Sequence, residues 1–196
     1  MTEPYLGRSL DRVEDERFLR GRGRFVADLA VQGALHGVVV RSPHAHARIN
    51  DIDVSAARRM PGVAAVFTGA DLAADGIGPL PCGVTNIAMA KPLVVPPCHA
   101  LAREAVHYVG EPVVFVVAES VEAARDAAEA VAIAYEPLIP IVSLADAVRP
   151  QSPVIWPEAP GNIAFVYDRG EMAPVQAAIR NATHVVECEL VNNRVV

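Results

Sequence analysis

Apolar residues gather in short runs that have the length and composition of β-strands. The runs 33–41, 47–54 and 63–68 are rich in valine, isoleucine and alanine, and polar or turn-forming residues follow each of them. Polar positions interrupt the second run irregularly after Ile49, a pattern typical of a bulged strand. These runs predict three strands.

The most continuous apolar run, 113–117, predicts a strand that is buried on both faces. Ser120 follows this run and is placed to cap a helix over 121–131. Four apolar residues are expected to form the buried face of this helix: Val121, Ala124, Ala128 and Val131. A returning strand is predicted at 132–137, where a proline ends it.

Weaker patterns predict three further elements. Ser55 is placed to cap a short helix over 56–60, and another short helix is expected at 174–182. The segment 183–196 alternates apolar and acidic residues and predicts a strand. Because this strand stops in mid-pattern, we expect that the chain once continued.

A strand–helix–strand pattern occurs twice, around "SAAR" at 55–58 and around "EAAR" at 122–125. Two such units packed on one sheet would produce this repeat. A chance clustering of alanines would produce it as well, and the sequence leaves both explanations open.

Prolines and glycines mark the segments between these elements. The segment 69–101 is predicted to be a long irregular loop, which is uncommon in a compact domain unless the loop is functional or packs on something else. A second proline-rich segment, 148–162, predicts an extended connector.

The first twenty residues form a charged arm that leads to Gly21 and Gly23. A Gly-x-Gly among arginines can hold a phosphate, but here no strand precedes it and no third glycine follows. We therefore interpret this segment as a turn whose arginines pair with nearby acids, which are Asp11, Glu14, Asp15 and Glu16.

Composition limits the class of protein. The chain is 52% hydrophobic over 196 residues, which is ample for a core, and its net charge of −6 argues against a nucleic-acid-binding protein. It contains no apolar run near the roughly 20 residues that cross a bilayer, and no secretory signal is evident at its polar N-terminus. Cys82, Cys98 and Cys188 are odd in number and widely spaced, which favours reduced thiols and a cytoplasmic protein.

Two pairs of residues were considered as metal ligands. His44 and His46 lie two residues apart in "RSPHAHARI", but in an extended segment their side chains point to opposite faces. Cys98 and His99 form a second pair within a proline-rich loop. Neither pair has further ligands at zinc-binding spacing, so the preferred interpretation is loop histidines bonded to the backbone.

Glu104, Glu111 and Glu136 are scattered carboxylates without a nucleophile or triad spacing. Glu111 is the most notable of them, since it lies between Gly110 and Pro112 just before a buried strand. It could mark the edge of an active site, but a carboxylate that accepts backbone N–H bonds in the turn is the commoner case.

Six motifs follow one another along nearly the whole chain. They are "GRSLDRVEDERFLRGRGRFVADL", "LHGVVVRSPHAHARI", "PGVAAVFTGADL", "VHYVGEPVVFVVAES", "AYEPL" and "PEAPGNIAF". Together they resemble the N-terminal part of the molybdenum-binding large subunit of the xanthine dehydrogenase, aldehyde oxidase and carbon monoxide dehydrogenase family. The acidic arm and "RGRGRFVAD" are most similar to the bacterial carbon-monoxide-dehydrogenase branch.

The resemblance implies an α+β fold with three parts. These are a charged arm over 1–20, an α/β hammerhead domain over 21–140, and over 141–196 an extended connector with the first, incomplete elements of the molybdopterin-binding domain. In this family the histidines of "RSPHAHARI" are not metal ligands. The motifs that hold the cofactor and supply the catalytic glutamate come later and are absent here, so we assign no catalytic, cofactor-binding or metal-binding residue.

For the parent complex, the resemblance implies oxidation of a small substrate with water as the oxygen source. The large subunit would carry molybdenum–molybdopterin of the cytosine dinucleotide type, and partner subunits would carry iron–sulfur clusters and FAD. This chain alone is expected to have a structural role without catalysis. The alternative is a stand-alone binding or assembly module derived from that subunit. The loop at 79–99 departs most from the expected pattern, so substrate or partner specificity could differ there.

Overall fold

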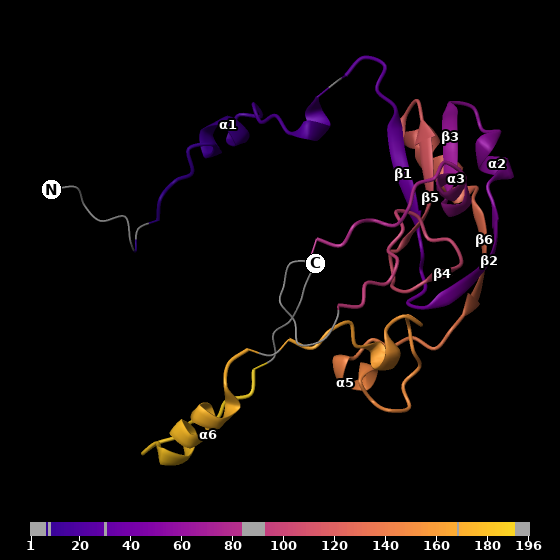
Figure 1. Cartoon of the computed structure of the whole chain (residues 1–196). Coiled ribbons are helices and arrows are strands. Elements are labelled where there is room, and N and C mark those ends of the chain that lie inside the picture. Colours follow the sequence, from indigo (N-terminus) through magenta and orange to yellow (C-terminus); the bar gives the residue numbers. More distant parts are fainter. Residues whose placement is uncertain (1–6, 8, 30, 84–92, 168, 191–196) are drawn as a thin grey trace. The chain divides into compact units, whose positions relative to one another are not determined.

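The computed structural model describes residues 7, 9–29, 31–83, 93–167 and 169–190 (Figure 1). The helices are α1 (Asp15–Leu19), α2 (Ser55–Arg58), α3 (Gly69–Ala74), α4 (Val121–Glu129), α5 (Leu144–Ala147) and α6 (Met172–Asn181), with short 3-10 turns η1 (Val26–Asp28) and η2 (Pro160–Asn162). The strands are β1 (His36–Arg41), β2 (Ala47–Asp53), β3 (Val63–Thr68), β4 (Ala105–Val106), β5 (Pro112–Ala118) and β6 (Ala132–Pro137). The mixed helix and sheet content confirms the α+β expectation.

The described strands form two three-stranded sheets, with the orders β1-β5-β3 and β4-β2-β6. Both strand–helix–strand units of the sequence are present, as β2-α2-β3 and β5-α4-β6. The idea that both units pack on one sheet is wrong, because β3 pairs with β5 whereas β2 pairs with β6. Each strand–helix–strand unit therefore has one strand in each sheet.

The antiparallel pairing of β2 with β6 contains the expected bulge. Ile49 lies opposite Tyr135 and Asp51 lies opposite Ala134, so the register shifts between Ile49 and Asp51. One extra residue on β2 produces this shift, as in a β-bulge. The irregular alternation in the sequence thus correctly predicted a local feature of the strand.

The chain divides into two compact units, and the first comprises 1–38, 54–66 and 116–131. In this unit the Ser120 hydroxyl accepts a hydrogen bond from the Ala123 N–H at 3.1 Å and caps α4, as predicted. The buried residues of α4 are Ala124 and Ala127, and Ala128 is only half-buried. The buried face of the helix is therefore rotated slightly from the face that the sequence predicted.

The start of α2 differs from the prediction. Val54, not Ser55, occupies the N-cap position, and Ser55 is the first residue of the helix. Val54 is 8% exposed, so its burial in the core places the beginning of the helix one residue earlier than the polar side chain suggested. A hydrophobic contact has overridden a local capping preference.

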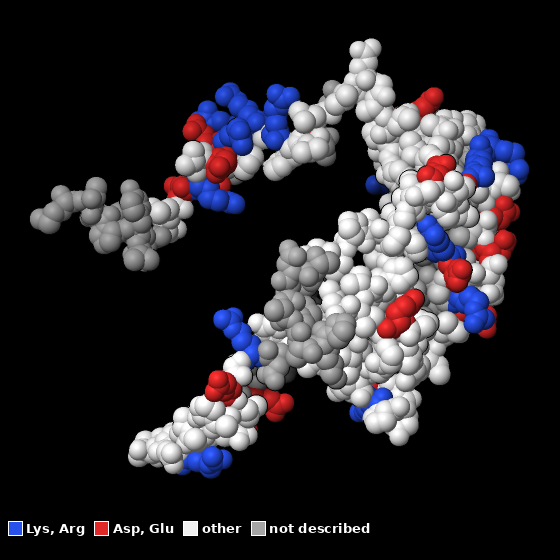
Figure 2. All heavy atoms as spheres, in the orientation of Figure 1, with Lys and Arg blue, Asp and Glu red and all other residues white. Residues whose placement is uncertain are grey.

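The N-terminal arm of the same unit contains α1, which the sequence analysis did not predict. Arg12 pairs with Asp15 at 3.1 Å and Arg20 pairs with Glu16 at 2.8 Å, which confirms that arginines of this segment pair with its acids. Figure 2 shows these charges of both signs side by side along the arm. Three of these side chains are well exposed and Asp15 is half-buried, so surface pairs of this kind contribute little to stability.

The second unit comprises 39–53, 67–115 and 132–196. Here the irregular loop expected from residue 69 onward begins with the helix α3, so the prediction is wrong for 69–74. Thr68 and Asp71 form a reciprocal capping box: the Thr68 N–H donates to Asp71 Oδ2 at 2.7 Å, and the Asp71 N–H donates to Thr68 Oγ1 at 3.3 Å. Described residues 75–83 and 93–101 form no helix or strand, and 84–92 lie outside the described residues.

The proline-rich connector has more internal order than its sequence suggested. Asn162, whose φ is +57°, donates through Nδ2 to the carbonyls of Ala147 and Pro153, both at 2.9 Å. Its Oδ1 accepts from the Ile155 N–H at 2.9 Å. One amide side chain thus joins two positions within the connector to the end of α5.

The strand expected at 183–196 is absent over 183–190, and 191–196 lie outside the described residues. Val186 and Leu190 are 91% and 84% exposed. No described strand pairs with this segment, and an alternating pattern without a partner strand has no hydrogen-bond ladder to hold it. The helix expected at 174–182 is present as α6.

We expect Val116→Asp to destabilise the protein severely. Val116 is fully buried in β5, and an unpaired carboxylate there costs several kcal/mol, a large part of a net stability of about 5–15 kcal/mol. Val142 is 89% exposed, so Val142→Asp is the matched control. Denaturant unfolding of both variants checks this, and a Val116→Asp midpoint equal to that of the control would show that β5 is not a core strand.

Candidate functional site

Two loops of the second unit are joined through their backbones. The Ser42 N–H donates to the Glu111 carbonyl at 2.9 Å, and the Gly110 N–H donates to the Ser42 carbonyl at 2.8 Å. Arg41 Nη1 also donates to the Gly110 carbonyl at 2.8 Å. Gly110 has a φ of +89°, which side-chain-bearing residues rarely adopt. These contacts, which we call the 42–111 clasp, fix the loop of His44 and His46 beside the loop that ends at Glu111.

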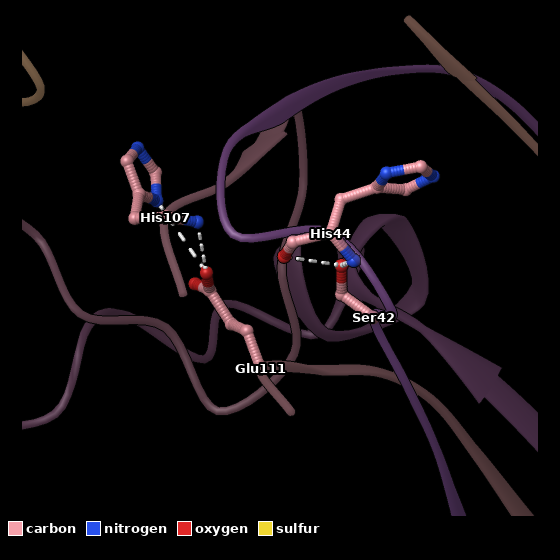
Figure 3. A network of polar contacts seen from close by, with 4 residues as sticks. All are labelled: Ser42, His44, His107 and Glu111. Atoms are coloured by element: carbon pink, nitrogen blue, oxygen red, sulfur yellow. Dashed lines mark hydrogen bonds and ion pairs between the residues drawn. The ribbon is translucent and has the colours of Figure 1, made fainter. Parts of the chain in front are cut away.

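Glu111 is 7% exposed, and its carboxylate faces His107 (Figure 3). Its Oε2 accepts the backbone N–H of His107 at 2.5 Å and lies 3.5 Å from His107 Nδ1. The structural interpretation of Glu111, a carboxylate that accepts a backbone N–H in the turn, is therefore confirmed. The same side chain also lines a cavity.

His44 and His46 have different neighbours, as their spacing indicated. The His44 backbone N–H donates to the Ser42 hydroxyl at 3.0 Å, and the His44 ring packs edge-on against Tyr135 at 4.9 Å between centroids. In Figure 3 this ring points away from Glu111. His46 Nδ1 donates to the Ile139 carbonyl at 3.0 Å, which agrees with the interpretation of a loop histidine bonded to the backbone.

An aromatic stack joins the two loops to the connector. The ring centroids of His107 and Trp156 are 3.6 Å apart, with an interplanar angle of 13°. The ring centroids of His46 and His107 are 5.9 Å apart, with an interplanar angle of 29°. The His107 side chain is only 15% exposed. Trp156 is the only tryptophan of the sequence, and its position in the proline-rich connector was the one signal that could have drawn attention to this stack.

These residues form one wall of a cavity of about 770 Å³. Its nitrogen-bearing side chains are His46, Arg48, His99, Arg103, His107 and Trp156. Ile49, Leu138 and Ile155 supply apolar surface, and Glu104, Glu111 and Glu158 supply carboxylates. The volume lies within the range of small-molecule sites, and the lining is richer in charged and polar side chains than such sites usually are.

Of the other residues that the sequence analysis singled out, some line the cavity and some do not. His99 lines the cavity, whereas Cys98 is exposed and does not line it. Glu104 also lines the cavity, and Glu136 instead pairs with Arg48 at 2.9 Å. The sequence analysis missed Arg103, His107 and Trp156. Among the described residues, no group of three His, Cys, Asp or Glu side chains is arranged to hold a metal ion.

Burial raises the pKa of Tyr135 above its ordinary value of 10.0. The nearby Ser42 hydroxyl acts in the opposite direction, and the negative charge of Glu111 adds to the increase. Burial also raises the pKa of Tyr108, again with a contribution from Glu111. The negative charge of the Glu111 carboxylate thus contributes to the raised pKa of both tyrosines, because it disfavours a second negative charge nearby.

The fold defines an α+β domain built from two small sheets, with strand–helix–strand units crossing between them. Residues 20–139 match the family model described as "Aldehyde oxidase and xanthine dehydrogenase, a/b hammerhead domain". The chain belongs to the aldehyde oxidase and xanthine dehydrogenase family and contains its α/β hammerhead domain. This confirms the resemblance that the six motifs indicated.

Named relatives agree with this membership. The chain is 41% identical over 188 residues to the nicotine 6-hydroxylase large subunit of Paenarthrobacter nicotinovorans, covering 95% of this chain and 22% of the relative. It is 39% identical over 150 residues to the carbon monoxide dehydrogenase large chain of Afipia carboxidovorans, covering 76% of this chain and 17% of the relative.

A solved structure of the Cu,Mo-CO dehydrogenase in its carbon monoxide reduced state matches with a TM-score of 0.61 and 41% identity, covering 75% of this chain and 17% of that one. The chain thus spans about a fifth of the length of the relatives it matches. Within the part of the chain that the structure describes, no helix is long and apolar enough to cross a membrane.

We predict that the double variant His44→Ala, His46→Ala has the same metal content as the wild type. The two side chains have separate neighbours, and no third ligand accompanies them among the described residues. Elemental analysis of both purified proteins checks this. Stoichiometric zinc in the wild type that disappears in the variant would contradict the prediction.

We also predict that ionisation of Tyr135 lowers stability in alkaline solution. Because its pKa is raised on folding, the unfolded chain loses this proton first, so the contribution of Tyr135 is complete below pH 10.0 and is lost as the pH rises through the folded-state pKa. Tyr135→Phe should therefore lose less stability than the wild type between neutral and strongly alkaline pH. Urea unfolding as a function of pH tests this, with the half-exposed Tyr167 changed to Phe as the control. Identical pH slopes for wild type and Tyr135→Phe would refute it.

Proposed function

We propose that this chain is the N-terminal structural portion of a molybdenum hydroxylase large subunit, of the carbon-monoxide-dehydrogenase and xanthine-dehydrogenase type. The observation that carries the proposal is 41% identity over 95% of the chain to a hydroxylase large subunit that is several times longer. The proposed parent complex oxidises a small substrate with oxygen from water. In this proposal the arm covers 1–20, the hammerhead domain 21–140, and the connector with the first elements of the molybdenum-binding domain 141–196.

The proposed cofactor of the parent subunit is molybdenum–molybdopterin of the cytosine dinucleotide type. Iron–sulfur clusters and FAD would lie on partner subunits. The naming of molybdenum in a matching carbon monoxide dehydrogenase structure supports the metal. The residues described here do not fit a resident metal centre, since none of them form a group of three suitable ligands. We therefore assign no step of the reaction to this chain, and the three free cysteines support a reducing, cytoplasmic location.

The structural role requires a surface for the rest of the complex, and α6 supplies a candidate. Met172, Val175 and Ile179 lie at helical spacing and are 68%, 53% and 52% exposed. Exposed apolar residues on one face of a helix are typical of a surface that another segment covers. We propose that the remainder of the molybdenum subunit covers this stripe.

Purification of a tagged 196-residue chain from its native cell tests the proposal. We expect polypeptides of a molybdenum hydroxylase to co-purify with it, together with molybdenum. The same chain produced alone in a heterologous host should contain no molybdenum and have no oxidoreductase activity. Stoichiometric molybdenum in that isolated chain, or recovery from the native cell without any such subunit, would contradict the proposal.

A pair of α6 variants makes the test specific. Val175→Asp with Ile179→Asp places charges in the apolar stripe and should reduce the recovered molybdenum at least about tenfold. Ala173→Asp adds one charge to the same helix away from the stripe and should leave recovery unchanged. Equal recovery with both variants would exclude α6 as the covered surface.

A further inference from the structure

The cavity of the second unit contains nitrogen atoms that lack partners. His99 Nδ1, Arg103 Nε and His107 Nδ1 are buried and form no hydrogen bond, and all three residues line the cavity. Buried polar atoms in folded proteins nearly always have a partner, since an unpaired one costs about 1–3 kcal/mol. His107 Nδ1 has the Glu111 carboxylate 3.5 Å away, so His99 Nδ1 and Arg103 Nε are the two atoms around this cavity that indicate a group that the protein itself does not supply.

Arg103 defines what that group must offer. Its guanidinium is held in place, because Nη2 donates to the Ile77 carbonyl at 2.9 Å and the side chain passes close to Gly69. A Cβ at position 69 would lie 2.9 Å from Arg103 Cγ and 2.5 Å from the Ala102 carbonyl, so only glycine leaves this path open. The Nε–H of arginine can only donate, and the side chain stays charged at any ordinary pH. The missing partner is therefore an acceptor, and a negatively charged one fits best.

The carboxylates of the cavity do not supply that acceptor. Glu111 faces His107, where its Oε2 already accepts the backbone N–H at 2.5 Å and lies 3.5 Å from Nδ1 (Figure 3). Glu104 and Glu158 also line the cavity, but both are exposed. Among the described residues, no carboxylate lies within ion-pair distance of Arg103. The second arginine of the wall, Arg48, pairs with Glu136 at 2.9 Å.

We propose that this cavity binds a small organic carboxylate. Its oxygens would accept hydrogen bonds from Arg103 Nε and from the imidazole of His99 or His107, and its apolar body would pack on Ile49, Leu138 and Ile155. The volume of about 770 Å³ is ample for such a molecule. The proposal rests on this cavity alone and holds whether or not the chain belongs to a molybdenum enzyme complex.

Calorimetric titration of the 196-residue chain tests the proposal with two matched probes. Cyclohexanecarboxylate carries the charged group on an apolar ring, and cyclohexanecarboxamide has nearly the same shape without the charge. We expect the carboxylate to bind at least about tenfold more tightly than the amide. Equal affinities, or no binding of the carboxylate, would overturn the proposal.

Variants locate the site. Arg103→Gln should weaken carboxylate binding at least about tenfold, whereas Arg125→Gln, a change at an exposed position of α4, should leave it unchanged. If Arg103→Gln does not fold, histidine side-chain NMR of the wild type decides. The carboxylate should then shift the imidazole signals of His99 and His107 but not that of the exposed His36. A shift confined to other histidines would refute the site.

A protein side chain is the other source of the same carboxylate chemistry. A short glutamate-containing peptide with blocked ends serves as the probe for it. If the peptide binds in an Arg103-dependent way while cyclohexanecarboxylate does not, the cavity is a docking point for an acidic segment and the small-molecule proposal fails. If the carboxylate binds and the peptide does not, the proposal is supported.

Discussion

The mutual backbone hydrogen bonds of the 42–111 clasp are the constraint on which the rest of the candidate site depends. Ser42 is 2% exposed and donates to Glu111 while its own carbonyl accepts from Gly110. This arrangement joins the end of β1 to the start of β5, two segments far apart in the sequence. Two of its three hydrogen bonds join main-chain atoms, so these two tolerate changes of side chain except where Gly110 needs a positive φ, and Arg41 adds a side-chain bond to the Gly110 carbonyl. The histidine loop, the buried carboxylate and the cavity wall all take their positions from it.

The connector completes the cavity through contacts of a different kind. Trp156 stacks on His107 at 3.6 Å, and the Leu138 N–H donates to the His46 carbonyl at 2.9 Å. The Asn162 side chain, which follows Trp156 along the chain, forms three hydrogen bonds with backbone groups that precede Trp156. These bonds order the loop that carries Trp156. Aromatic stacking adds about 0.5–1.5 kcal/mol beyond simple burial. A segment with many prolines and little regular structure can therefore form a stable wall.

Local patterns in the sequence were sufficient for most of the strands and for the cap of α4. The apolar runs that form strands can be recognised from a few consecutive residues. The cap of α4 is equally local, because Ser120 accepts a hydrogen bond from the N–H of Ala123, three residues later. The assignment of strands to sheets could not be obtained in this way, because β2 pairs with β6, which lies far along the chain: Ala47 is opposite Pro137 and Asp53 is opposite Ala132. The Thr68–Asp71 capping box was a local signal that glycine and proline content obscured. The strand expected at 183–196 failed for a different reason: its pattern was local, and among the described residues no strand pairs with 183–190.

The candidate site was less accessible to sequence reasoning than the fold. His99 and Arg103 are four residues apart in a loop, and nothing in their order indicates that both line a cavity with unpaired nitrogen atoms. Glu111 has two separate physical effects on its surroundings. Its carboxylate accepts a backbone N–H and so stabilises the turn, and the same buried charge contributes to the raised pKa of Tyr135. A charge that is buried to hold a turn also sets the electrostatic conditions of the cavity beside it. The Arg103 and His99 nitrogens that lack hydrogen-bond partners are the positive and hydrogen-bonding groups of the cavity that this carboxylate does not satisfy.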